Sequence, residues 1–360
     1  MKAVLIHILF FISVSAKYKM TKYMITENMI TVPFHLEESS VDIIKSINLQ
    51  DAYSYLSIQY GDNRKNESIF FNDKIITLKT MRTTILLDTF HINWEYLYPS
   101  DVDYWLIHNS KKGIGFGYQN NQSNTFTVQM KNQNIIDRAI FAFYPDNKTM
   151  YFGDIPHELI SNKYSLKCDL NSKFQFGCNL NGVIFSQKNH NDIKVRIQSV
   201  VLFQSFGGYL QVPYDFSKYL NETYFSSFFL EDKCDYIEQK SYYQNYHCDC
   251  EIKGNFPDIT LLIDGKHLYL SKEILFKERS GICHFIIYST KESEQWIFEP
   301  DFITQYITVF DNENGSVTMY SSSLFEKKKS INIKSFVILM IIYNILSILF
   351  ITIINKIYFN

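Results

Sequence analysis

One stretch in the middle of the chain, residues 200–213, restricts the fold more than any other. It reads VVLFQSFGGYLQVP, an apolar run followed by a polar pair, two glycines and a second short apolar run that ends in proline. Apolar runs bounded by glycine and proline are typical of buried strands joined by a tight loop. Gly207 and Gly208 can adopt the backbone conformations that a sharp turn inside a sheet requires. The stretch therefore predicts a strand, a tight loop and a second strand.

Short alternating or apolar runs separated by turn residues recur along the chain, which is the pattern of an all-β protein. These runs are residues 75–78, 83–87, 140–144, 195–203, 259–263 and 306–310. Helical periodicity is best at residues 127–137 and 214–224, which we expect to form short helices. The 360 residues suffice for one large or two medium domains.

Both ends of the chain carry export or membrane signals. Residues 1–16 contain a lysine, a short apolar run and small residues at the end, which predicts a secretory signal peptide rather than a buried strand. Residues 336–354 are mostly apolar and about long enough to cross a bilayer as a helix. The lysines of residues 326–335 oppose the positive-inside rule, but a cleavable signal commits the following chain to translocation. We therefore predict a single-pass type I membrane protein of the secretory pathway or cell surface.

Glycosylation sequons and the cysteine pattern also favour export. The sequons begin at Asn66, Asn121, Asn147, Asn221 and Asn314. The six cysteines lie between residues 168 and 283, an even set that predicts three disulfides in an oxidising compartment. Six cysteines permit fifteen connectivities, and the residues alone leave the choice open.

Metal, cofactor and nucleic-acid functions find little support. His247, Cys248 and Cys250 are the alternative zinc ligands, but no second pair completes a tetrahedron, so we predict no metal. The formal net charge of −2 gives no indication of a nucleic-acid partner. We predict no cofactor.

The C-terminal half resembles the pepsin-like aspartic proteases. Residues 200–213 are similar to the family's second active-site loop, in which an apolar strand leads into Asp-Ser/Thr-Gly. Residues 256–266 resemble its Pro-Asp-Ile strand and Asp-Gly turn, and residues 296–302 and 306–314 resemble its terminal strand pair. Glu299 and a proline stand where the family usually has Gly-Asp.

The N-terminal half carries further matches in the family's order. Residues 113–118 resemble a shortened Gly-Ile-Leu-Gly-Leu-Gly loop, residues 128–144 the segment after it, and residues 151–156 the strand and turn near the lobe crossover. The resemblance implies an all-β, bilobal pepsin-like fold with a cleft between the lobes, and the chain adds one C-terminal transmembrane helix.

Combined with the terminal signals, the resemblance implies the order of the domains along the chain and the pairing of one disulfide. The parts are a signal peptide (1–16), a shortened N-terminal lobe (17–157), a C-terminal lobe (158–325), a basic linker (326–335), a transmembrane helix (336–354) and a short tail (355–360). The family's C-lobe bridge implies that Cys250 pairs with Cys283. We assign the other four cysteines to the pairs Cys168 with Cys178 and Cys234 with Cys248.

Three registers compete for the first active-site loop. In the first, Asp88 and Thr89 resemble the first Asp-Thr-Gly loop. In the second, Tyr60 corresponds to the tyrosine of the family's flap. In the third, residues 55–71 form the strand pair before the loop, and Asn72 takes the catalytic position. None of the three supplies two aspartates.

The chemistry of the family makes the second loop decisive. Its reaction needs two carboxyl groups that share one proton, one acting as base on water while the other hydrogen-bonds the carbonyl. Gln204 stands at the second aspartate position, and an amide cannot ionise or act as a base. Phe206 and Phe90 place large rings where the family has glycines. The alternative is a carboxylate relocated to Asp215 or Asp88; we instead interpret Gln204 as a buried amide and Asp88 as a structural or solvated carboxylate.

The sequence therefore predicts a membrane-anchored, pepsin-like homologue that lacks proteolytic activity and binds an extended peptide or protein in its cleft. Tyr60 and Ser205 are the candidate cleft residues. An active aspartic endopeptidase with a non-standard dyad is one alternative, and a structural surface glycoprotein is another.

Overall fold

The computed structural model describes most of the chain between residues 18 and 321. The described ranges are 18–26, 29–36, 41–48, 62–71, 74–98, 114–118, 125–169, 176–187, 191–208, 210–239, 243–290 and 294–321. The chain divides into two compact units, Met1–Phe325 and Glu326–Asn360, and every described residue belongs to the first. The predicted signal peptide, the predicted membrane helix, Tyr60, Asn72 and Asn121 lie outside the described residues. Among the helices within these ranges, none is long and apolar enough to cross a membrane.

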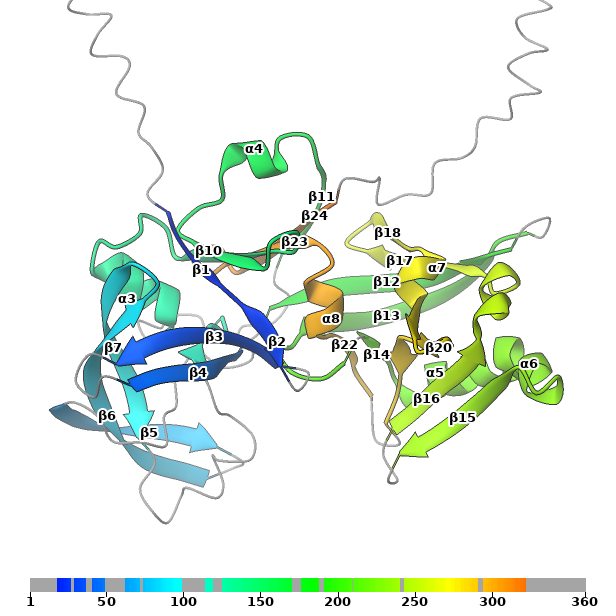
Figure 1. The fold of residues 1–360 in the computed structure, drawn as a ribbon, viewed down its shortest axis with the longest axis horizontal. Coiled ribbons are helices and arrows are strands. Elements are labelled where there is room, and N and C mark those ends of the chain that lie inside the picture. The colour runs from blue at the N-terminus through cyan, green and yellow to red at the C-terminus, as the bar shows by residue number, and fades with distance from the viewer. Residues whose placement is uncertain are drawn as a thin grey trace, which may run out of the picture. The chain divides into compact units, whose positions relative to one another are not determined.

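One six-stranded sheet combines segments from both halves of the chain (Figure 1). Every neighbouring pair of its strands is antiparallel. In spatial order the strands are β1 (Lys19–Lys22), β10 (Thr149–Phe152), β9 (Ile140–Tyr144), β23 (Ile307–Asp311), β24 (Ser316–Ser321) and β11 (Tyr164–Asp169). The start, the middle and the end of the described chain therefore share one sheet.

A seven-stranded sheet is built from the N-terminal half. Its path is β5 (Asp62–Phe71), β6 (Lys74–Leu87), β3 (Met29–Leu36), β4 (Val41–Asn48) and β8 (Ile114–Gly115), with β2 (Met24–Thr26) paired to β3 and β7 (Phe90–Tyr98) paired to β6. Successive side chains of a strand point to opposite faces. In β6 this alternation buries Met81, Thr83, Ile85 and Leu87 on one face.

Two sheets are built from the C-terminal half. The first, of seven strands, runs β18 (Lys266–Leu270), β17 (Asp258–Ile263), β12 (Gly177–Ser186), β13 (Ile193–Phe203), β22 (Trp296–Phe298), β14 (Leu210–Gln211) and β21 (Ile287–Tyr288). The second, of four strands, runs β15 (Cys234–Gln239), β16 (Tyr243–Asp249), β20 (Ile282–Phe285) and β19 (Phe276–Arg279). All six predicted strand runs are confirmed, because each lies in or overlaps one of these strands.

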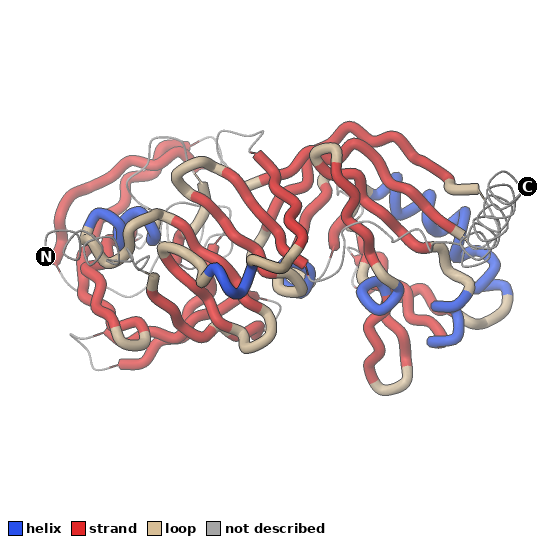
Figure 2. The backbone as a smooth tube through the Cα atoms, turned by 90° about the horizontal axis from the view of Figure 1, so that it is seen from above, coloured by secondary structure: helices blue, strands red, loops and turns tan. Residues whose placement is uncertain are grey.

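Helices are short, and strands make up most of the described backbone (Figure 2). The first predicted helix is confirmed as α3 (Phe126–Asn132), although it ends five residues before the predicted end at residue 137. The second is confirmed as α5 (Tyr214–Leu220), which continues through a π-helical turn (Asn221–Phe225) into α6 (Ser226–Leu230). The others are α4 (His157–Ile160), a 3-10 helix (Cys250–Gly254), α7 (Lys272–Leu275) and α8 (Pro300–Ile303). The predicted lobe boundary between residues 157 and 158 falls at the start of α4 and stays a prediction.

The two seven-stranded sheets repeat one arrangement of four strands. β3 and β4 form an antiparallel pair, β4 continues in parallel with β8, and β3 pairs on its other side with β6. In the C-terminal sheet, β12 and β13 form the antiparallel pair, β13 continues in parallel with β22, and β12 pairs on its other side with β17. The hairpins β6–β7 and β17–β18 are equivalent as well, with two-residue turns at Asp88-Thr89 and Asp264-Gly265. This repeat assigns counterparts between the two halves without any appeal to sequence similarity.

Phenylalanines form the core where the shared sheet meets the C-terminal half. The ring of Phe310 in β23 stacks on Phe141 of β9 at a centroid distance of 4.8 Å. It meets Phe176 at 4.9 Å and Phe203 of β13 at 5.5 Å, both edge-on. Because Phe203 ends the strand that leads into the Gln204 loop, this cluster fixes where the loop begins.

Candidate functional site

The loop after β13 crosses the end of β22. β22 pairs in parallel with β13 on one side and antiparallel with β14 on the other. The connection from β13 to β14 must therefore cross the end of β22. The backbone N–H of Gln204 donates to Phe298 O at 2.9 Å, which holds the start of the loop against the end of β22. The predicted strand, loop and strand are confirmed.

The first two side chains of the loop are buried, and the third lies at the surface. Gln204 and Ser205 are 6% and 1% exposed, so the interpretation of Gln204 as a buried amide is confirmed. Phe206 is 41% exposed and forms a bridge with Met29, and the N–H of Ile30 donates to Ser205 O at 3.0 Å. The loop therefore accommodates a large ring where the family has glycine, because the ring lies at the surface.

The structure places Asp88 in a hairpin turn and not in an active-site loop, which agrees with its interpretation as a structural or solvated carboxylate. Asp88 is exposed and opens the β6–β7 turn with a φ of 53°. Its counterpart is Asp264, which has a φ of 45° in the β17–β18 turn, and not Gln204. Aspartate tolerates positive φ better than most residues, so the turn explains Asp88 without a catalytic role. Phe90 begins β7 and is buried, with its ring centroid 6.2 Å from that of Phe152.

The counterpart of Gln204 in the N-terminal half follows β4. Gln204 comes directly after the strand that pairs in parallel with β22, and β4 is the strand that pairs in parallel with β8. β4 ends at Asn48, so the counterpart falls within residues 49–61, outside the described part of the chain. Asp51 is the one acidic residue of that segment. Sequence analysis did not single out this segment, because the repeat of strand pairings is not visible in the residues.

A buried carboxyl group that the sequence analysis did not assign to the site lies beside the loop. Glu299 directly follows β22 and is 1% exposed. The hydroxyl of Tyr288, at the end of β21, donates to Glu299 Oε1. The signal in the sequence was the departure from the family's Gly-Asp. Only the strand pairing shows that Glu299, the residue at this position, lies beside the Gln204 loop.

The three disulfides form as predicted, joining Cys250 to Cys283, Cys168 to Cys178 and Cys234 to Cys248. Because the sulfur atoms of Cys248 and Cys250 are both in disulfides, the alternative zinc site at these residues is wrong.

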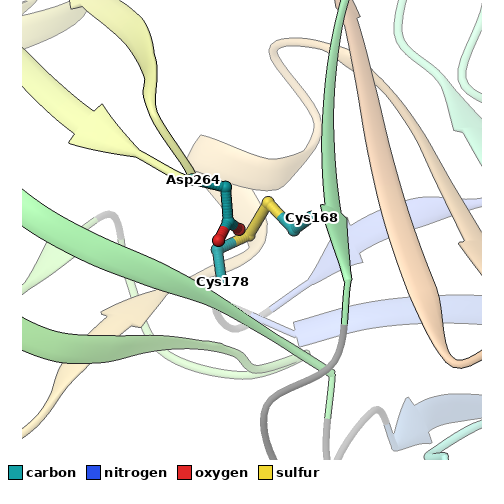
Figure 3. A group of neighbouring side chains, drawn as sticks. All are labelled: Cys168, Cys178 and Asp264. Atoms are coloured by element: carbon teal, nitrogen blue, oxygen red, sulfur yellow. A yellow bond between two sulfur atoms is a disulfide. The ribbon is translucent and has the colours of Figure 1, made fainter.

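Two groups of side chains in the described residues are close enough to hold a metal ion, but each contains a disulfide. One group is Cys168, Cys178 and Asp264 (Figure 3). The carboxylate of Asp264 accepts from Asn179 Nδ2 at 2.6 Å and from the Asn179 backbone N–H at 3.3 Å. These bonds tie the β17–β18 turn to β12, which is a structural role.

A row of titratable side chains crosses the four-stranded sheet. Direct strand pairing places Asp235, His247, His284 and Lys277 side by side. The ring centroids of the two histidines are 4.2 Å apart. Burial lowers the pKa of His247, although Asp235 opposes this. Burial also lowers the pKa of His284, and the neighbouring His247 and Arg279 lower it further.

We expect the histidine pair to weaken the fold as the pH falls. Both pKa values are lower in the folded chain than the ordinary value of 6.5, so the unfolded chain takes up protons first. The free energy of unfolding should therefore be constant above about pH 7.5 and fall as the pH passes below about 6.5, until the folded pKa values are reached.

Urea unfolding measured between about pH 5 and about pH 7.5 tests this expectation, because most carboxyl groups stay ionised there. His284→Asn should flatten the dependence, because it removes one of the two groups whose pKa is lowered in the folded chain. An unchanged slope in His284→Asn would contradict the prediction.

Comparisons with known proteins agree with this architecture. A family model described as eukaryotic aspartyl protease matches residues 36–321. A solved structure, an aspartic proteinase from Irpex lacteus, matches with a TM-score of 0.60 and 11% identity, covering 87% of this chain and 100% of that one. At that identity the match shows the fold alone. A comparison with curated proteins finds no match. The chain belongs to the eukaryotic aspartyl protease family and has its mostly β, bilobal pepsin-like fold.

Proposed function

We propose that this protein binds an extended peptide or protein in the manner of its family and does not cleave it. The observation that carries the proposal is Gln204, a buried amide at the end of β13, where the family's second catalytic aspartate belongs. An amide cannot take the proton of a water molecule or share a proton with a partner carboxyl group. Asp88 lies on an exposed turn and does not replace it. Asp51 would supply one carboxyl group of the two that the reaction needs.

An active endopeptidase with a non-standard dyad is the second candidate. It is favoured by one observation, the carboxyl group of Glu299 beside the Gln204 loop. Against it, Glu299 is 1% exposed, and a carboxyl group that activates water must meet both water and substrate. We therefore rank binding without cleavage first.

We expect the purified protein to cleave no member of a mixed peptide library between about pH 3 and about pH 7, because a shared-proton dyad is missing. Library members with an extended, partly apolar backbone should nevertheless be retained by the immobilised protein. Mass spectrometry of the supernatant measures cleavage, and elution of retained peptides measures binding.

Turnover that is inhibited by pepstatin, a transition-state mimic, would establish the second candidate instead. In that case Asp51→Asn and Glu299→Gln should each abolish turnover, and the control Asp88→Asn should not. An absence of both cleavage and retention would reject the two candidates together.

We also propose that the protein is exported and anchored by residues 336–354. The support is the apolar character of residues 1–16 and 336–354 and the three disulfides, which persist in oxidising compartments. The sequon residues Asn147 and Asn314 are exposed in the β9–β10 and β23–β24 turns, as glycosylation requires. Protease protection in intact microsomes tests this topology, and digestion of the chain from the cytosolic side would reject it.

A further inference from the structure

Gly207 and Glu299 share one small space inside the Gln204 loop. Gly207 has a φ of 102°, a conformation that side chains other than glycine rarely adopt. A Cβ atom added to Gly207 would overlap Cδ and Oε1 of Glu299 and would lie 2.7 Å from Oε2. The carboxyl group thus occupies the volume that a side chain at position 207 would fill. Position 207 can be only glycine as long as Glu299 points into the loop.

Glu299 is held from two sides. Its backbone carbonyl accepts from the N–H groups of Phe302 and Ile303, both at 2.9 Å, which fixes the residue at the start of α8. Its side chain does not cap that helix. The side chain instead turns toward the loop, where the Tyr288 hydroxyl donates to Oε1.

The same hydroxyl connects the carboxyl group to the strand that leaves the loop. Tyr288 is 8% exposed and its Oη atom lies 3.4 Å from Gln211 Oε1 in β14. The backbone N–H of Asp301 donates to Gly208 O at 3.3 Å. Tyr288 in β21, Glu299 after β22 and Asp301 in α8 therefore hold the second half of the loop. The bond from the Gln204 N–H to Phe298 O holds its start.

A fully buried carboxyl group is uncommon in folded proteins unless it has a specific partner. We propose that Glu299 is the positioning residue of this loop: its carboxyl group, supplied by the neighbouring strand and held by Tyr288, takes the place of a side chain that the loop lacks at position 207. Glu299 thereby keeps Gln204 and Ser205 inside and Phe206 at the surface. The inference rests on the proposed function, because it names the residue that sets the loop conformation a bound peptide would meet.

A double-mutant cycle tests the shared space in the full chain. Gly265→Ala is the matched control, because Gly265 also has a positive φ, 75°, but nothing lies within 4 Å of the added Cβ. Gly265→Ala should lower the Tm by about 2–4 °C, the effect of backbone strain alone. Gly207→Ala should lower it by at least about twice as much, because the methyl group also displaces the carboxyl group.

The excess shift should disappear when Gly207→Ala is made in a Glu299→Gly background, where the space is empty. Equal Tm shifts for Gly207→Ala and Gly265→Ala would show that position 207 and Glu299 do not compete for one space, and would overturn the proposal. An excess Tm shift that persists in the Glu299→Gly background would overturn it in the same way.

Hydrogen exchange tests the positioning role even if Glu299→Gly does not fold. Tyr288→Phe removes one hydroxyl, and the amides of Gln204 and Leu210 should then exchange about tenfold faster. The amide of Asp264, which donates to Asn179 O at 3.0 Å in the distant β17–β18 turn, is the internal control and should not change. Unchanged exchange at Gln204 and Leu210 would overturn the proposal.

Peptide affinity separates the positioning role from the proposed function. Peptides retained by the wild-type protein should bind Tyr288→Phe about tenfold more weakly, because the loop is less well ordered. Unchanged affinity would mean that Glu299 supports the fold but does not position the ligand site, which would overturn the proposal. If the wild-type protein retains no peptide while the exchange and Tm results hold, the proposed function fails and the positioning of the loop stands.

Discussion

Replacing Phe310 with alanine is expected to lower the free energy of unfolding by about 3–5 kcal/mol. The residue is fully buried, and its ring lies against Phe141, Phe176 and Phe203 at centroid distances of 4.8, 4.9 and 5.5 Å. These neighbours come from different parts of the chain, so the void cannot be closed by one segment moving inward. The loss combines the transfer free energy of the ring with the unfilled cavity.

Denaturant unfolding at neutral pH measures this loss. Leu230→Ala is the control, because Leu230 is 88% exposed, and its effect should stay within about 0.5 kcal/mol. Hydrogen exchange of the Gln204 amide should also rise in Phe310→Ala, since Phe203 ends the strand that leads into the loop. A loss below about 1.5 kcal/mol would show that the core refills the space and would contradict the prediction.

The strands and the second loop could be predicted because their signals are local. An apolar run interrupted by Gln204 and followed by Gly207 and Gly208 has few conformations available, and the structure has the strand, loop and strand that these residues predict. The two short helices were visible for the same reason, since their apolar residues recur at helical spacing. The pairing of Cys250 with Cys283 followed the family resemblance, and the other two pairs were assigned from the four cysteines that remained.

The N-terminal counterpart of the Gln204 loop could not be predicted, because only the pairing of the strands identifies it. Asp88-Thr89 looks like a catalytic pair in the sequence, but aspartate is equally suited to a hairpin turn with positive φ, where Asp88 lies. Only the parallel pairing of β4 with β8 shows that the counterpart of Gln204 follows Asn48. In the same way, Glu299 could be seen as an unusual residue, but its contact with Gly207 depends on β22 lying between β13 and β14.

Removing the disulfide between Cys250 and Cys283 is expected to lower the free energy of unfolding by about 3–4 kcal/mol. The two residues are 33 apart in sequence, and the bridge restricts the unfolded chain over the whole segment that contains β17, β18, α7 and β19. The double variant Cys250→Ala/Cys283→Ala tests this by denaturant unfolding without any reductant, so that the other two disulfides stay closed.

The control is the bridge between Cys234 and Cys248, which are 14 residues apart and directly opposite each other in the β15–β16 hairpin. The shorter loop predicts a loss of about 3 kcal/mol for Cys234→Ala/Cys248→Ala, smaller than that for the longer loop. The order of the two losses is the informative result, because three of the four cysteines lie in the four-stranded sheet and Cys250 directly follows its strand β16. A larger loss for the short loop would show that native packing around the sulfur atoms, and not the restriction of the unfolded chain, determines what each bridge contributes.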